Sequence, residues 1–249
     1  MKLTRRTAAA LLGAGLLPVG PPADAQISKP RVPPGRHPGG WPVAFIGPGV
    51  DYTLDGIASR LARDGEGEIV GWDFVDSDRR PWQACTAFDC GTATAQTVLA
   101  EHGASNLVVI RATADRPQTL VDAVKLASRG PARIVLIAPE AADLPNGFRA
   151  EAASRHPTLL FVVPAAPRAS TEQPPAMTPD YPNVIVVAAS TAVPIGLPVP
   201  GADIAVPVFL HYPAGVPIYK ASTDVAAARV AALTSRLQAP EPPADIHRR

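Results

Sequence analysis

Residues 105–138 read SNLVVIRATADRPQTLVDAVKLASRGPARIVLIA, and this stretch decides the fold. Residues 107–110 and 134–138 are continuous apolar runs, as expected for strands that are covered on both faces. Between the two runs, residues 118–128 are expected to form a helix that ends before Gly130-Pro131. A strand, a helix and a second strand in this order are typical of a parallel sheet with crossover helices.

The same alternation continues on both sides of this stretch. We expect further strands at residues 43–46, 68–75, 159–163 and 184–189, with weak ones near Ile204 and Val208. We expect further helices at residues 53–63 (capped by Thr53), 92–101, 147–155 and 222–237. The sequence therefore predicts an α/β fold, with a doubly wound, mostly parallel sheet and helices on both faces.

The composition fits one ordinary domain. Of 249 residues, 47% are hydrophobic, which is enough for a buried core and excludes overall disorder. The 30 prolines argue against a helical bundle. A formal net charge of +1 gives no reason to expect nucleic acid or an anionic membrane surface as partner.

The first 25 residues are typical of a signal peptide. Lys2 and the pair Arg5-Arg6 precede an apolar run at residues 8–19 that is too short to span a bilayer, and the pair resembles a twin-arginine signal. Small residues in Ala23-Asp24-Ala25 predict cleavage before Gln26, although a buried N-terminal helix is the alternative. We expect export to the periplasm or the medium, a linker at 26–40, one domain at 41–238 and a disordered tail at 239–249. The mature chain is expected to lack a membrane span.

Six segments, in this order, resemble the subtilisin-like serine proteases. They read VAFIGPGVDY (43–52), GWDFVD (71–76), CGTATA (90–95), AVKLA with RIVLI (123–127 and 133–137), YPNVIVVAA (181–189) and STDVAAARVA (222–231). In that family the first segment carries Asp-Thr-Gly, the third His-Gly-Thr, and the last Gly-Thr-Ser ahead of an alanine-rich helix. The resemblance covers residues 41–238 and implies a subtilisin-like fold.

The departures from the family pattern fall on its catalytic positions. Gly47 stands in place of the aspartate, Cys90 in place of the histidine, and Asp224 in place of the nucleophile. The oxyanion-hole asparagine falls on Pro167 or Arg168. A thiol with an ordinary pKa is no base near neutral pH, and a carboxylate puts negative charge where an oxyanion develops. The resemblance therefore implies an inactive peptidase homologue, with no catalytic residue of its own, that binds an unknown peptide or protein or serves as a scaffold.

Other readings of the same residues stay open. An active subtilisin-like endopeptidase with a displaced triad would need a histidine, for which His211 is the best placed. A thiol redox role for Cys85 and Cys90 is weakened because their spacing is not Cys-x-x-Cys. Five loop carboxylates could bind calcium, but their spacing matches no known loop and solvated carboxylates are commoner: Asp51, Asp55, Asp73, Asp76 and Asp78. No cofactor and no metal site is expected.

We predict that the exported protein begins at Gln26. N-terminal sequencing of the protein isolated from its native host measures this directly. A product that still begins at Met1 would contradict both the cleavage site and the expected export.

We also predict that Cys85 and Cys90 form a disulfide, rather than two free thiols or half of a metal site. An exported protein meets oxidants, and the short loop limits the stabilisation to about 2 kcal/mol. Mass measurement after alkylation without reductant should find neither thiol modified. Two alkylated thiols in the unreduced protein would exclude the bond.

Overall fold

Seven strands form one sheet in the order β2-β3-β1-β4-β5-β6-β7, and every pairing in it is parallel. The computed structural model describes residues 29–84, 91–138, 148–165, 181–190, 202–208 and 223–238. The strands are β1 (Trp41–Gly47), β2 (Trp72–Asp73), β3 (Ser105–Arg111), β4 (Ile134–Ile137), β5 (Leu160–Pro164), β6 (Val184–Ser190) and β7 (Ile204–Pro207). The expected doubly wound parallel sheet is confirmed.

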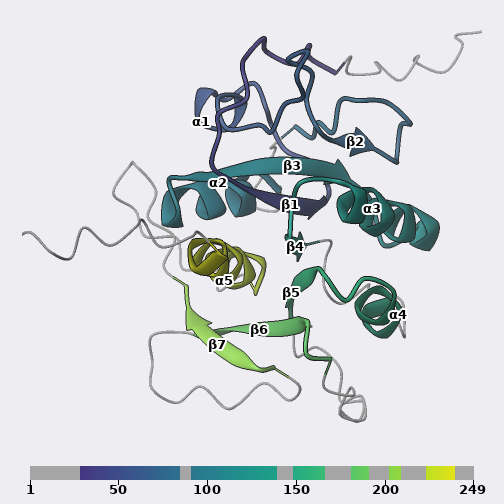
Figure 1. The fold of residues 1–249 in the computed structure, drawn as a ribbon, viewed down its shortest axis with the longest axis vertical. Coiled ribbons are helices and arrows are strands. Elements are labelled where there is room, and N and C mark those ends of the chain that lie inside the picture. Colours follow the sequence, from purple (N-terminus) through teal and green to yellow (C-terminus); the bar gives the residue numbers. More distant parts are fainter. Residues whose placement is uncertain are drawn as a thin grey trace, which may run out of the picture.

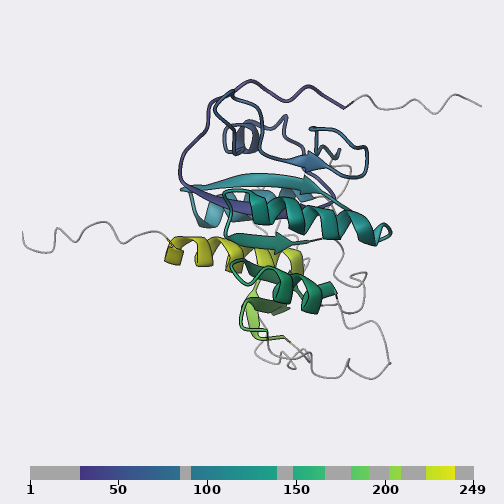
Figure 2. The same ribbon diagram turned by 45° about the vertical axis from the view of Figure 1, so that its right-hand side comes forward.

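Helices cover both faces of the sheet (Figure 1). On one face lie α2 (Gly91–Glu101) and α5 (Thr223–Gln238), and on the other lie α3 (Pro117–Arg129) and α4 (Phe148–Arg155). The turned view brings α3 and α4 in front of the sheet (Figure 2). The two faces bury separate apolar clusters, one with residues of α2 and α5 and one with residues of α3 and α4.

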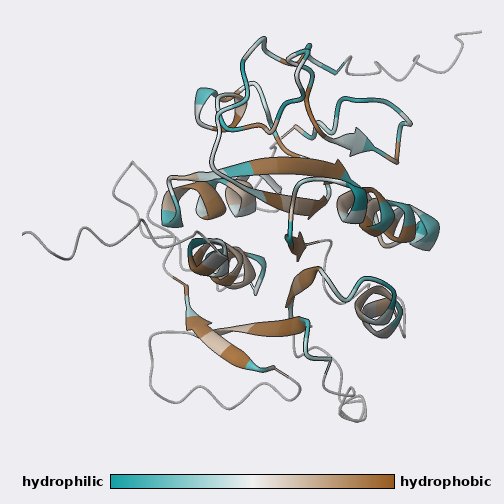
Figure 3. Cartoon of the chain, in the orientation of Figure 1, coloured by the Kyte–Doolittle hydropathy of each residue, from teal (hydrophilic) through white to brown (hydrophobic). Residues whose placement is uncertain are grey.

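The central strand β1 shows how the sequence divides between these two clusters. Val43 and Phe45 belong to the cluster under α2 and α5, whereas Ala44 and Ile46 belong to the cluster under α3 and α4. All four side chains have no exposed surface, and the strands of the sheet centre are apolar along their length (Figure 3). Because side chains alternate along a strand, position 47 falls on the α2 and α5 side.

Two elements before α2 are shorter than expected. The helix predicted over residues 53–63 is only α1 (Asp55–Ala58), and Thr53 does not cap it. Instead, the Asp51 carboxylate accepts hydrogen bonds from the amide and the hydroxyl of Thr53. After α1 the chain turns inward to pair with β3, where the amide of Ala62 donates to the carbonyl of Leu107.

The strand predicted over residues 68–75 also shrinks, to the two residues of β2. Ile69 pairs antiparallel with Arg63 before the strand begins. After the strand, the Asp73 carboxylate accepts hydrogen bonds from the amides of Val75 and Asp76, which turns the chain away from the sheet. A side chain–backbone turn therefore replaces the ladder that apolar Phe74 and Val75 suggested.

The N-terminal segment (residues 29–40) lies against the domain, although it contains no helix and joins a strand only at Trp41. Tyr52 donates a hydrogen bond to the carbonyl of Pro30 at 2.8 Å, and Arg63 donates one to the carbonyl of Pro33 at 2.7 Å. The predicted signal peptide, residues 26–28 of the predicted linker and the predicted tail lie outside the described residues. Across the described part of the chain, no helix has the length and apolarity needed to cross a membrane.

Candidate functional site

The carboxyl end of β1 lies where the winding of the sheet changes direction. The chain passes from β2 through α2 to β3 on one face, and then from β3 through α3 to β4 on the other face. β1 lies between β3 and β4. The connections through α2 and α3 therefore pass on opposite faces of the sheet around β1. Open parallel sheets bind ligands in the crevice at such a point. Gly47 is the last residue of β1 and therefore marks this edge.

Gly47 is buried and has little free space at its Cα. A Cβ atom built there would lie 3.0 Å from Cζ of Phe45 and 3.2 Å from the carbonyl oxygen of Ala138, just past the end of β4. Both distances are shorter than ordinary van der Waals contact. A carboxylate at position 47 therefore requires the Phe45 ring to move.

The start of α2 reaches the same place. A Cβ atom on Gly91 would lie 2.2 Å from the carbonyl oxygen of Gly49 and 2.9 Å from the Phe45 ring. The hydroxyl of Thr92 accepts a hydrogen bond from the amide of Asp51 at 2.8 Å, which joins α2 to the loop after β1. Cys90, the residue before α2, lies outside the described residues.

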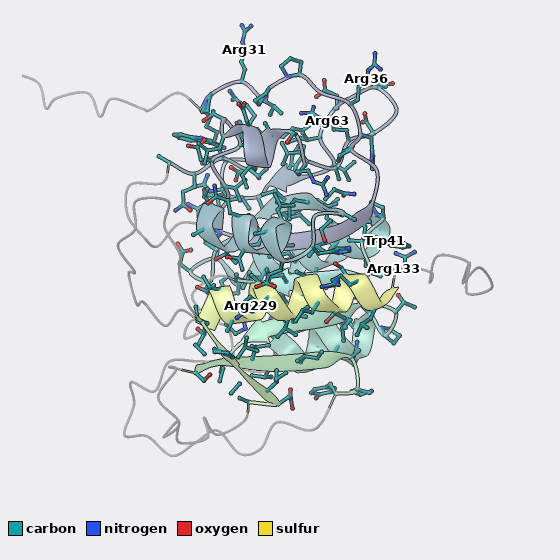
Figure 4. All side chains as sticks on the ribbon, turned by 90° about the vertical axis from the view of Figure 1, so that its left-hand side faces the viewer. Arg31, Arg36, Trp41, Arg63, Arg133 and Arg229 are labelled. Atoms are coloured by element: carbon teal, nitrogen blue, oxygen red, sulfur yellow. The ribbon has the colours of Figure 1, made fainter. Side chains whose placement is uncertain are left out.

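The start of α5 lies at the same level as the start of α2. At the other ends of these helices, Nδ1 of His102 is 2.7 Å from Oγ of Ser235. Asp224 and Gly91 each lie eleven residues before one of these two partners, about 16 Å along a helix. Figure 4 shows Arg229, in the first half of α5, on the opposite side from Trp41 and Arg133, which lie where β1 and β4 begin.

Gly47 and Asp224, two of the three positions where the family pattern has its triad, therefore lie at one edge of the sheet. Gly91, the residue after the third position, lies at the same edge. Gly47 ends β1, Gly91 follows Cys90, and Asp224 lies partly buried in the first turn of α5. Val225 belongs to the same buried cluster as Phe45 and Ala138. A carboxylate in the first turn of a helix interacts favourably with the helix dipole.

No histidine of the described residues lies at this edge. The exposed His37 accepts a hydrogen bond from Gly39, whose carbonyl contacts Asn106 near the start of β3. His156 follows α4 and precedes β5, and burial together with Arg155 lowers its pKa. All of these positions belong to the amino edge of the sheet. His211 and His247 lie outside the described residues.

His102 follows α2 and lies beside two serines of other elements. Its Nδ1 lies within hydrogen-bond distance of Ser105 and Ser235, whose own hydroxyls are 3.0 Å apart. Burial, together with Arg236 and Arg60, lowers the pKa of His102. Both serine side chains are fully buried at the amino edge, so this cluster joins α2, β3 and α5 and offers no accessible nucleophile. Nothing in the local sequence indicated a partner 133 residues away.

Three of the five carboxylates considered for calcium are engaged by cations of the protein. Asp73 and Asp76 each contact Lys29 and Arg111, and Asp78 contacts Lys29 and Arg80. In the part of the chain that the structure describes, no group of three or more histidine, cysteine or acidic side chains is arranged to hold a metal ion. We refer to Asp73, Asp76 and Asp78 as the acidic loop.

The chain was compared with known proteins. No protein-family model and no curated protein matches it, whereas 33 chains of solved structures do. One is a cold adapted subtilisin-like serine proteinase, with a TM-score of 0.49 and 13% identity over 80% of this chain and 76% of that one. Another is the Patellamide maturation protease PatG, with a TM-score of 0.45 and 16% identity over 81% of this chain and 77% of that one.

We predict that Gly91→Ala lowers the free energy of unfolding by about 2 kcal/mol or more, because the new methyl group meets a backbone carbonyl that cannot move alone. Gly56→Ala in α1 is the matched control, since nothing lies within 4 Å of its Cβ position. It should change the stability by no more than about 0.5 kcal/mol. Urea denaturation measures both variants, and equal effects would contradict the close approach of α2 to β1.

Proposed function

We propose that this protein is an exported, non-catalytic homologue of the subtilisin-like serine proteases. Its role is to bind a peptide or protein at the carboxyl edge of the sheet, or to act there as a scaffold. The proposal combines the resemblance of six sequence segments with the arrangement of the residues at that edge.

The observation that carries the proposal is the packing around Gly47. A serine protease needs a carboxylate that orients its base, and by resemblance that carboxylate belongs at position 47. Here the Phe45 ring and the Ala138 carbonyl lie within 3.0–3.2 Å of the Cβ position. A side chain at position 47 requires these neighbours to shift by a few tenths of an ångström, so the packing favours glycine at this position.

Asp224 supports the same conclusion from the side of the nucleophile. By the resemblance, Asp224 takes the place of the nucleophile, and a carboxylate there puts negative charge where an oxyanion hole must favour it on the substrate. Two negative charges in one place repel each other. The site is therefore poorly suited to stabilise a tetrahedral oxyanion.

The place of the site fits a binding role, because open parallel sheets bind their ligands at the carboxyl edge. The formal net charge of +1 gives no reason to expect nucleic acid as the partner. The predicted cleavage after Ala25 leaves the domain that carries this edge intact.

We predict no serine-protease activity in the purified protein that begins at Gln26. A fluorogenic peptide panel and labelling with a serine-reactive fluorophosphonate measure it, with an active subtilisin-like enzyme as positive control. Gly47→Asp, Cys90→His and Asp224→Ser should each be inactive alone, because triad members act as a unit. The triple variant should recover at most a trace, since the missing oxyanion donor alone costs about two to three powers of ten.

Stoichiometric labelling of the unmodified protein, with turnover blocked by a serine-directed inhibitor, would contradict the proposal. It would favour the active peptidase with a displaced triad. Turnover that is lost on alkylation and in Cys90→Ala would instead identify a cysteine nucleophile.

A further inference from the structure

The proposed function gives no role to the ion pairs that Lys29, in the N-terminal segment, makes with the acidic loop. Its ammonium lies 2.5 Å from Asp73, 2.8 Å from Asp76 and 3.3 Å from Asp78, so it contacts all three carboxylates of the acidic loop. The Lys29 side chain is 12% exposed and that of Asp73 is fully buried. This is a charge-paired contact between residues 44 positions apart.

The contact is electrostatically favourable in spite of its burial. Burial opposes the charge of Lys29, but hydrogen bonds to Asp73 and Asp76 outweigh it and raise the pKa of Lys29. The hydrogen bond from Lys29, with a second from Arg111, lowers the pKa of Asp76. Lys29 therefore remains cationic and Asp76 anionic throughout the neutral range. Removing the ammonium would leave Asp73 and Asp76 sharing one guanidinium, and a buried carboxylate short of a partner is costly.

The same two carboxylates reach the candidate site through Arg111. Its Nη1 lies 3.0 Å from Asp73 and 2.7 Å from Asp76, and its Nε donates to the carbonyl of Pro48 at 3.0 Å. Arg111 ends β3 beside Gly47, and its Cδ would lie 3.1 Å from a Cβ atom on Gly49. One guanidinium thus joins the acidic loop to the loop after β1.

We propose that Lys29 is a latch that couples the N-terminal segment to the candidate site. With Lys29 in place, Asp73 and Asp76 share their charge between two cations and leave Arg111 oriented toward Pro48. With Lys29 withdrawn, both carboxylates draw on Arg111 alone, and residues 48–51 lose the fixed orientation of this guanidinium. The state of the segment therefore sets the order of the loop at the carboxyl edge, whether or not that edge has catalytic activity.

The place of Lys29 in the chain gives this coupling a use. It is the fourth residue after the expected cleavage behind Ala25. A partner that holds the predicted signal peptide therefore acts within a few residues of Lys29. The candidate site would then reach its ordered form only when the segment is free to seat on the domain.

Native-state amide hydrogen exchange tests the latch, with Lys29→Gln to remove the charge and Lys29→Arg to keep it. Exposed Arg31, in the same segment, gives the matched control Arg31→Gln. The amides to follow are those of Val50, which donates to Pro81, and of Gln83, which donates to Val50. Amides of β4 in the sheet centre report any change in overall stability.

In Lys29→Gln we expect exchange at Val50 and Gln83 to quicken at least tenfold more than exchange in β4. Lys29→Arg should restore most of the protection, and Arg31→Gln should leave it unchanged. If all amides quicken equally in Lys29→Gln, Lys29 contributes only to overall stability and the latch is wrong. If exchange at Val50 and Gln83 in Lys29→Gln stays as it is in the unmodified protein, Lys29 does not act on the loop after β1 and the latch is again wrong.

Discussion

The contact between the start of α2 and the end of β1 is the constraint on which the site depends. Gly91 brings its backbone against the Gly49 carbonyl and the Phe45 ring, at distances that no side chain allows. This approach sets the level of α2 on the sheet, and the His102, Ser105 and Ser235 cluster then sets the level of α5 relative to α2. The starts of both helices are thereby brought to the edge that Gly47 marks. The alanine-rich inner side of α5 allows the close packing that this needs, as Ala226, Ala227 and Ala228 are fully buried.

The constraint that builds the edge also limits its chemistry. The Phe45 ring lies 3.0 Å from the Cβ position of residue 47, so the edge is closely packed where, by the resemblance, a protease carries a carboxylate. The guanidinium of Arg111, which ends β3 beside Gly47, is paired with Asp73 and Asp76 of the acidic loop. Among the described residues, this edge has no group that is placed to move protons between nucleophile and leaving group.

Most of the fold could be predicted from the sequence, because it depends on local patterns. Continuous apolar runs between helices gave the central strands to within a residue or two, and the order of these runs gave the parallel sheet. The errors lie where short side chain–backbone turns replace the expected elements. The Asp51 carboxylate accepts hydrogen bonds from the amide and the hydroxyl of Thr53, which does not cap a helix, and the Asp73 carboxylate ends β2 by accepting hydrogen bonds from the amides that follow it. For the site, the resemblance pointed to positions 47 and 224, but it did not predict how the residues there pack. The contacts of Lys29 with the acidic loop and of His102 with two serines could not be predicted from the local sequence. Each residue contacts at least one partner that lies far away in the chain.

The central claim is that the residues at the positions of a protease triad meet in one place and cannot act as a triad. A crystal structure of the protein that begins at Gln26 tests it most directly, because it would include Cys90 and the residues that follow β4 and β5. The account predicts that Gly47, Cys90 and Asp224 line one crevice at the carboxyl edge, with no histidine in hydrogen-bond reach of a serine, threonine or cysteine there. A histidine such as His211 found beside such a nucleophile in that crevice, or Cys90 and Asp224 facing separate surfaces, would contradict it.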